Sequence, residues 1–387
     1  MMKYLVKAQR ALIGEKLQVL ENAVILVEND KIVSIGRQDE ITCIQGAYKE
    51  IELGDVTLMP GLIDCHSHTS MDARLEGHLE MTSDPAGDLA VRSVALAKDD
   101  LMSGITTCRI LGDKQYVDIS VRNAINNGLI EGPRLLVAGI GMRSVHGHGF
   151  IGVPHTGVQE FLKTCRNNML RKVEWLKVFV TAGAPPINSD YIPSFLSLEE
   201  IECVTSEAKR MGIRTSAHCI GGEGLIHCIK AGIDVIDHAY CATDSDLELI
   251  KEHDRWVCLT PSVFMDLERN TKNTKSVQIN TEKGRDRVIK TMQKIVTSGV
   301  KYAIGSDALH ASMGIEAGYA VELGASNYDA LAGVTTNAAK LCGVDTKCGS
   351  LDVGKYADLI AVEGNPLDHI DSLNHVRFVM KSGVRYR

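Results

Sequence analysis

The sequence predicts an α/β protein in which parallel strands alternate with helices, beside a small domain of short strands. Three observations lead to this expectation. The chain has 387 residues, which is longer than most single small domains. Hydrophobic residues make up 44% and charged residues 24%, so the chain can bury a large core. From residue 58 onward, short apolar runs are followed by longer stretches of helical period, which is typical of repeated βα units.

The two chain ends have a different pattern from the middle. Residues 1–57 predict short strands, and Asn29-Asp30 predicts a hairpin turn between two of them. Residues 348–387 return to short strands after the helical stretches end. We therefore expect residues 1–57 and 348–387 to pair into one small β-sandwich domain.

Between these ends we expect eight strands, at residues 58–66, 105–111, 134–140, 175–180, 214–219, 234–240, 256–261 and 301–307. Helical stretches follow most of them, for example residues 197–211, 222–231 and 282–298. Eight parallel strands alternating with helices close a (β/α)8 TIM-like barrel, whose functional groups lie at the C-terminal ends of the strands. Residues 58–347 are the predicted barrel domain.

Composition argues against several classes of partner. The formal net charge is −7 and no long basic run occurs, which disfavours nucleic acid. No apolar run approaches the roughly 18 residues of a membrane-spanning helix. Charged residues interrupt the first segment too early for a signal peptide, so we expect a cytoplasmic protein. The eleven cysteines, from Cys43 to Cys348, contain no Cys-x-x-Cys pair and predict reduced thiols.

Potential metal ligands recur at the ends of the predicted strands. His66 and His68 end the first barrel strand, where side chains at positions i and i+2 point to the same side. His218, His238 and Asp307 end the fifth, sixth and eighth strands. Because these strand ends lie at one rim of the barrel, the pattern predicts a site for a divalent metal.

Lys177 lies inside the apolar fourth strand, between Leu176 and Val178. Burying an ammonium group is costly, so this lysine needs a chemical reason for its position. The alternative is an ordinary lysine whose amine reaches solvent at the end of the strand.

The residues His66, His68, Lys177, His218, His238 and Asp307, in this order, resemble the binuclear metal centre of the amidohydrolase superfamily. The segments MPGLIDCHSH, GSDALH, VTTNAAKLCG and GSLDVGKYADLIAVEGNPL also resemble recurring segments of that superfamily. The ligand order and the Gly-His-Gly loop are similar to its imidazolonepropionase-related and prolidase-like branch, which includes dipeptidases and aryl-amide hydrolases.

The resemblance implies that Lys177 is N-carboxylated and bridges two divalent metal ions. Zinc suits imidazole and carboxylate ligands, although manganese or cobalt could occupy the same set. His66, His68 and Asp307 would hold one ion, and His218 and His238 the other. A hydroxide bridging the metals would attack the substrate, with Asp307 as the general base and acid.

The resemblance also suggests residues that contact the substrate. His148 corresponds to the histidine of the family's Gly-Gly-His-Gly stretch, and Tyr240 lies two residues beyond His238. Arg109 and Arg143 are candidates for binding a substrate carboxylate. We rank His146 and His155 lower and treat His78, His227, His253, His369 and His375 as structural.

Together these features predict a metal-dependent hydrolase that cleaves an amide-type C–N bond of a small molecule, either a dipeptide or an N-acyl amino acid. The alternative substrates are an aryl amide, a carbamate or a urea. A mononuclear deaminase is disfavoured because the glutamate that should closely follow the fifth-strand histidine comes late, at Glu223. A non-catalytic scaffold is disfavoured by the presence of all six ligands. We expect a homo-oligomer with no nucleic-acid or membrane partner.

Overall fold

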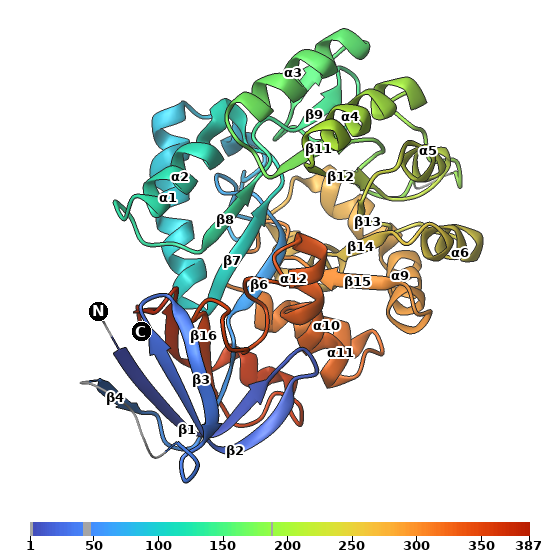
Figure 1. The fold of residues 1–387 in the computed structure, drawn as a ribbon. Helices are drawn as coiled ribbons and strands as arrows, with labels where there is room; N and C mark the ends of the chain where they lie inside the picture. Colours follow the sequence, from blue (N-terminus) through green and yellow to red (C-terminus); the bar gives the residue numbers. More distant parts are fainter. Residues whose placement is uncertain (1–2, 42–47, 187–188) are drawn as a thin grey trace.

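The computed structural model describes residues 3–41, 48–186 and 189–387. Figure 1 shows a sheet built from the two chain ends beside a larger unit in which parallel strands carry helices on their outside. The strands of the terminal sheet are β1 (Lys3–Ile13), β2 (Gln18–Glu28), β3 (Lys31–Arg37), β4 (Lys49–Glu52), β5 (Val56–Pro60), β16 (Leu359–Glu363), β17 (Val376–Lys381) and β18 (Val384–Arg385).

The terminal sheet confirms that the two chain ends pair. Its strand order is β18-β17-β16-β5-β1-β2-β3, with β4 pairing with β1. Strand β5 joins the ends because it pairs in parallel with β1 and antiparallel with β16. The described strands are therefore joined in one hydrogen-bonded sheet, with β4 off its main path, and the β-sandwich stays a prediction. The hairpin at Asn29-Asp30 is confirmed, since Glu28 faces Lys31 and Asn29 has φ 55°.

Each of the eight strands predicted for the middle of the chain overlaps a parallel strand of the structure, although the first prediction also covers the end of β5. They are β6 (Leu62–Ser67), β7 (Ile105–Ile110), β8 (Arg134–Val137), β11 (Trp175–Phe179), β12 (Arg214–Cys219), β13 (Val235–His238), β14 (Trp256–Leu259) and β15 (Lys301–Ile304). Two short strands, β9 (Met142–Ser144) and β10 (Val153–His155), lie in the loop region after β8.

These parallel strands form a three-stranded sheet, β6-β7-β8, and a seven-stranded sheet, β10-β9-β11-β12-β13-β14-β15. Backbone hydrogen bonds outside the ladders also link the two sheets, near β8 and β11 and near β6 and β15. The N–H of Glu174, before β11, donates to the Val137 oxygen at 3.0 Å, and the N–H of Asp307 donates to the His66 oxygen at 2.7 Å. The mixed α/β fold and its parallel strands are thus confirmed, while a continuous closed barrel stays a prediction.

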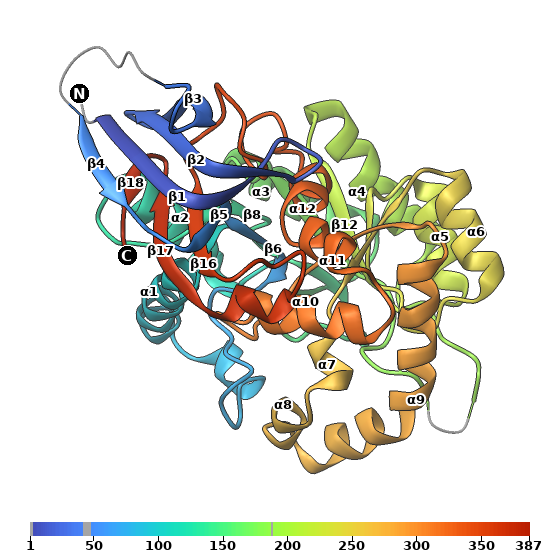
Figure 2. The same cartoon turned by 90° about the horizontal axis from the view of Figure 1, so that it is seen from below.

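The α-helices are α1 (Ala86–Met102), α2 (Val117–Asn126), α3 (Val158–Leu170), α4 (Leu198–Met211), α5 (Glu223–Ala231), α6 (Asp244–Glu252), α7 (Ser262–Met265), α8 (Leu267–Thr271), α9 (Lys275–Thr297), α10 (Met313–Glu322), α11 (Asn327–Gly333) and α12 (Thr336–Cys342). Short 3-10 helices cover Glu80–Ser83, Lys114–Tyr116 and Ile370–Asn374. Figure 2 shows α7 and α8 beside the long helix α9, near the ends of the parallel strands.

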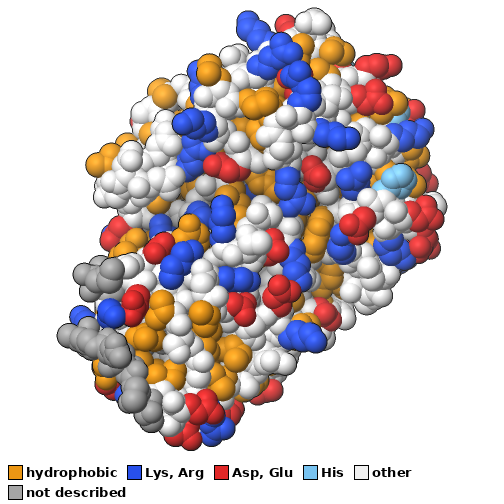
Figure 3. Space-filling model, in the orientation of Figure 1, with side chains coloured by type: hydrophobic (Ala, Val, Ile, Leu, Met, Phe, Trp, Pro, Cys, Tyr) orange, Lys and Arg blue, Asp and Glu red, His pale blue; other side chains and the backbone are white. Residues whose placement is uncertain are grey.

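The surface and the cysteines agree with the composition. Basic and acidic side chains are interspersed over the face that Figure 3 shows. The ten described cysteines carry free thiols, and Cys43 lies outside the described residues. Among the residues that the structure describes, no helix has the length and apolar character needed to cross a membrane.

The strand expected over residues 58–66 is two strands that belong to different sheets. Strand β5 ends at Pro60 in the terminal sheet, and β6 begins at Leu62 among the parallel strands. Gly61 lies between them, where a Cβ atom would come within 2.2 Å of the Thr106 hydroxyl. The chain can pass from one sheet to the other here because residue 61 lacks a side chain.

We expect Gly61→Ala to lower the free energy of unfolding by about 1–3 kcal/mol, the usual cost of overpacking a filled core. Gly87→Ala is the matched control, because Gly87 is exposed near the start of α1 with open space around its Cα. Alanine at residue 87 should leave stability unchanged or raise it by up to about 1 kcal/mol. Urea denaturation of both variants gives the comparison, and equal stabilities would show that the crossing at Gly61 is not tightly packed.

Candidate metal centre

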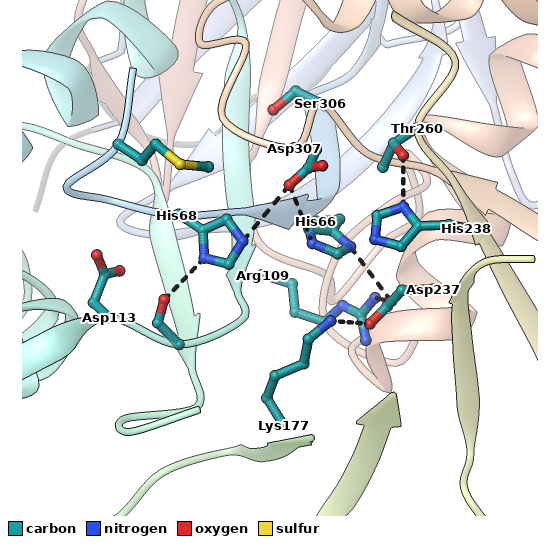
Figure 4. Close-up of polar contacts among 12 residues, drawn as sticks. His66, His68, Arg109, Asp113, Lys177, Asp237, His238, Thr260, Ser306 and Asp307 are labelled. Carbon is teal, nitrogen blue, oxygen red and sulfur yellow. Dashed lines mark hydrogen bonds and ion pairs between the residues drawn. The ribbon is translucent and has the colours of Figure 1, made fainter. Parts of the chain in front are cut away.

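The six predicted ligands lie in one region, at the carboxyl ends of the parallel strands. His66 is in β6 and His68 follows that strand directly. Lys177 and His218 lie within β11 and β12, and His238 is the last residue of β13. Asp307 follows β15. Figure 4 shows His66, His68, His238 and Asp307 turned toward one another, with Lys177 rising from below.

Two histidines point a nitrogen at the same carboxylate oxygen. The distance from His66 Nε2 to Asp307 Oδ1 is 3.4 Å, and that from His68 Nε2 to the same oxygen is 3.6 Å. One potential ligand atom from each of His66, His238 and Asp307 lies within 4.8 Å of the other two. The ring of His218 extends the cluster, since its centroid is 4.6 Å from that of His238.

Hydrogen bonds to the other ring nitrogens hold these histidines in place. His68 Nδ1 lies 2.8 Å from the carbonyl oxygen of Gly112, and His238 Nδ1 lies 2.8 Å from Thr260 Oγ1. His218 Nε2 lies 3.0 Å from the carbonyl oxygen of Ala182. Partners of this kind orient metal-ligating imidazoles and leave the remaining nitrogen free for the metal.

The donor set fits a divalent cation. A carbonyl oxygen can only accept, so His68 donates its Nδ1 proton to Gly112, and in the neutral ring Nε2 is a bare lone pair. That lone pair faces the Asp307 carboxylate, another acceptor. His66 Nδ1 is buried 3.5 Å from Asp237 Oδ1, while its Nε2 faces Asp307. Acceptors that converge on Asp307 in this way fit a divalent cation between them.

Burial keeps these imidazoles in the form that binds metal. Desolvation, followed by the nearby Lys177 charge, lowers the pKa of His66 to about 4. Desolvation also holds the pKa values of His218 and His238 well below the ordinary histidine value. Neutral imidazole is the ligand species, so no proton has to be displaced near pH 7.

Asp307 has the properties of a group that works on a substrate. Burial by itself raises the pKa of a carboxyl group, but electrostatic interaction with the His66 and His238 rings and with Arg269 outweighs this and lowers the pKa of Asp307. Its side chain is 21% exposed, whereas that of His66 is only 2% exposed. Arg269 also fixes the backbone here, because its Nη2 donates to the Asp307 carbonyl oxygen at 2.6 Å.

Lys177 is fully buried, which excludes the alternative of an amine in solvent. Its Nζ donates to Asp237 Oδ2, and desolvation lowers the pKa of the amine although the Asp237 carboxylate opposes this. Asp237 also receives Arg109 Nη2 at 3.1 Å and Ser216 Oγ at 2.6 Å. Sequence reasoning missed Asp237, because simple alternation puts it on the face opposite its neighbour His238.

A signal for this contact was nevertheless present in the sequence. Arg109, Lys177 and Asp237 are charged residues inside apolar strands, and buried charges need opposite charges as partners. The structure also corrects the expectation that Arg109 binds a substrate carboxylate. Its side chain is fully buried, and it donates to Asp237, Ser216 and the Cys65 carbonyl oxygen.

The predicted substrate contacts differ in how they lie. The His148 ring is 4.7 Å from that of His218, and burial lowers the pKa of His148 to about 4. Gly183 makes room for this ring, since a Cβ there would come within 2.4 Å of it. The Tyr240 hydroxyl is buried and donates to the Thr260 carbonyl oxygen at 3.0 Å, because β13 ends at His238 and alternation no longer holds two residues later.

The other candidates for contact with the substrate form hydrogen bonds with nearby protein groups. Arg143 Nη1 donates to carbonyl oxygens of its own loop, among them that of Ser144 at 3.0 Å. His146 contacts Ser144 Oγ, and His155 lies between the Val153 carbonyl oxygen and Thr164 Oγ1. These contacts give each side chain a local structural role.

The fold and the site define an α/β protein with a candidate metal centre at its strand ends. A sequence model of the amidohydrolase family matches residues 57–385, and the chain belongs to this family. It is 29% identical to ochratoxinase from Aspergillus niger, over 95% of this chain and 83% of the relative. It is 25% identical to imidazolonepropionase from Caldanaerobacter subterraneus subsp. tengcongensis, over 95% of this chain and 91% of the relative.

A solved structure gives the same result. A Xaa-Pro dipeptidase with bound methionine superimposes with a TM-score of 0.86 at 28% identity, covering 99% of each chain. The relationship to imidazolonepropionase and to prolidase-like amidohydrolases, which the sequence predicted, is therefore confirmed.

We expect Thr260→Val to weaken zinc binding about 10- to 100-fold, because valine keeps the shape but cannot hold the His238 ring by a hydrogen bond. Thr260→Ser is the matched control, since it keeps the hydroxyl and should bind zinc like the parent protein. Competition with a chelating dye measures both affinities. Equal zinc affinity of the valine and serine variants would mean that Thr260 does not orient the ligand.

Proposed function

We propose that the protein is a metal-dependent hydrolase that cleaves an amide-type C–N bond of a small molecule. The observation that carries this proposal is the convergence of imidazole lone pairs on the Asp307 carboxylate oxygen, at 3.4 Å from His66 and 3.6 Å from His68. Membership of the amidohydrolase family supports the same reading.

The ligand set divides between two sites. His66, His68 and Asp307 would hold one divalent ion, His218 and His238 a second, and an N-carboxylated Lys177 would bridge the two. Zinc is the metal we propose, since it is usually bound by the nitrogen of neutral imidazole and the oxygen of carboxylate. When bound, the ions would polarise a substrate carbonyl and lower the pKa of a water molecule, the chemistry that two-metal hydrolases share.

Asp307 is the proposed proton carrier. Its carboxylate is ionised, partly exposed and next to the ligand nitrogens, so it can accept a proton from the attacking water. The same oxygen can then deliver that proton to the nitrogen of the departing amine. One carboxylate would thereby serve as base in the first step and as acid in the second.

His148 is the proposed substrate contact beside the second pair of ligands. Its ring lies against His218, and its lowered pKa keeps it neutral, so one ring N–H can donate to a substrate oxygen without adding charge. Tyr240 supports the site through its ring, whose centroid is 5.1 Å from that of His238. Its hydroxyl would reach a substrate only after leaving Thr260.

A dipeptide or an N-acyl amino acid is the substrate class that we propose first. The similarity to the Xaa-Pro dipeptidase structure favours it. The ochratoxinase relative favours the second candidate, an aryl amide, carbamate or urea. A screen of zinc-loaded protein against dipeptides, acylated amino acids and aryl carbamates separates the two, and failure to turn over any of them would contradict the proposal.

We expect Asp307→Asn to reduce kcat about 10²- to 10⁴-fold while most of the bound metal stays, because asparagine keeps one oxygen but cannot accept a proton. The loss should be equal in kcat and kcat/KM, since the proton moves only on the way to the transition state. Asp234→Asn, at the opposite end of β13, is the control. Normal turnover by the Asp307 variant, with metal and melting temperature unchanged, would remove Asp307 from the mechanism.

We expect Lys177→Ala to lower the metal content from about two ions per chain to one or none, because the bridging ligand is lost. Short carboxylic acids added to this variant should partly restore both metal and activity by bridging in its place. Lys381→Ala, which removes another buried lysine in the terminal sheet, is the control. Elemental analysis finding two ions in the Lys177 variant would exclude the bridging role.

A further inference from the structure

Below the proposed metal ligands, Lys177 and Arg109 both donate to the buried carboxylate of Asp237. We propose that Asp237, held by Arg109, is a positioning residue that directs the Lys177 amine for carboxylation by CO2. This inference rests on the proposed function, because it concerns the bridging group that Lys177 is proposed to carry.

Asp237 is buried among side chains that hold both of its carboxylate oxygens, and its Oδ1 also lies 3.5 Å from His66 Nδ1. Its Oδ2 accepts Lys177 Nζ and, at 2.6 Å, Ser216 Oγ, while its Oδ1 accepts Arg109 Nη2 at 3.1 Å. Arg109 is fixed in turn by Ser216 Oγ at 3.1 Å and by the Cys65 carbonyl oxygen. All these side chains are buried, so water cannot take over the role of the carboxylate. Figure 4 shows Lys177 and Arg109 meeting at Asp237 below the histidines.

The carboxylation step defines what Asp237 must do. The nitrogen lone pair of the neutral Lys177 amine forms a bond to the carbon of CO2, one C=O π pair moves onto oxygen, and nitrogen loses one proton to the solvent buffer. The product is a planar carbamate that retains one N–H. If Asp237 Oδ2 accepts this N–H, as it accepts the amine, the new carboxylate group must lie on the opposite side of the nitrogen.

Arg109 makes this arrangement electrostatically possible. Without the guanidinium, a buried Asp237 carboxylate would face the new carbamate anion in a medium of low dielectric. The guanidinium is fully buried and lies against Asp237 and, at 4.6 Å from its Cζ, against the ring of Trp175. The pair therefore presents Lys177 with a neutralised acceptor instead of a bare negative charge.

The test uses zinc-loaded protein equilibrated with ¹³C-labelled bicarbonate, with the carbamate carbon observed by NMR and bound zinc measured on the same sample. We expect Asp237→Asn and Arg109→Met to reduce the carbamate signal by about tenfold or more, in line with the loss of other groups that orient a metal ligand. Arg109→Lys keeps the positive charge and should retain most of the signal.

Two further variants separate positioning from a loss of stability. The double variant Asp237→Asn/Arg109→Met removes the buried anion together with one of its two buried cations, so only Lys177 loses its partner. It should be more stable than Asp237→Asn alone, yet it still lacks the carboxylate and should give no carbamate. Asp358→Asn breaks another buried Arg–Asp pair, in which Arg134 Nη1 lies 2.6 Å from Asp358 Oδ2, away from the metal ligands. Its melting temperature should fall while its carbamate signal stays at the parent level.

The outcomes distinguish the two proposals. A parent protein without any carbamate signal would overturn the bridging lysine and this inference together. A strong signal in the parent and an equal signal per folded molecule in Asp237→Asn would overturn the inference alone. Loss of signal in both Asp237→Asn and Asp358→Asn would also overturn it, because the effect would then follow stability.

Discussion

One buried carboxylate, that of Asp237, binds side chains from three other strands, and these strands belong to two sheets. Asp237 on β13 binds Lys177 on β11, Ser216 on β12 and Arg109 on β7. Strand β7 belongs to the three-stranded sheet and the other strands to the seven-stranded sheet, so the contact crosses between the two sheets. Burying the Arg109 and Lys177 cations without an anionic partner would cost a prohibitive amount of free energy. The single anion makes their burial possible and holds the strands below the metal ligands in register.

A second buried carboxylate, that of Asp64, links β6 to the segment that follows β15. Asp64 on β6 accepts the N–H groups of His66 and Ser306, both at 3.0 Å, and the Ser306 hydroxyl at 2.6 Å. It thereby fixes His66 to the segment that carries Asp307, although β6 and β15 belong to different sheets. Burial raises the pKa of Asp64 to about 7. For Asp237, the effect of burial is outweighed by Lys177, and its pKa lies well below the ordinary value. The proposed ligands therefore lie directly above two buried carboxylates, those of Asp64 and Asp237.

The sequence predicts those parts of the fold and the site that depend on strand periodicity, and it does not predict those that depend on contacts between distant residues. Strand positions and the placement of the proposed ligands His66, His218 and Asp307 at strand ends follow from periodicity and from the way parallel strands share one rim. The two strands on either side of Gly61 could not be separated, because both are apolar and only the Thr106 contact divides them. Arg109 was misjudged because a polar group near a rim looks available until its partner, Asp237, is known. A substrate contact by Tyr240 stays a prediction, since its hydroxyl is bound to Thr260.

The failures of simple alternation concentrate at the ligands for a physical reason. His238 and Ala239 have φ values of 79° and 52°, and Asp307 and Ala308 have values of 49° and 67°. Left-handed backbone costs about 1–2 kcal/mol for a residue with a side chain, and glycine would remove that cost. Glycine cannot ligate a metal, however, so a histidine and an aspartate remain at these turns, each followed by a small residue. The turn after His238 also lets Asp237 and His238, adjacent in sequence, both contact the site. The strained backbone is thus what allows one strand end to supply both a ligand and the carboxylate beneath it.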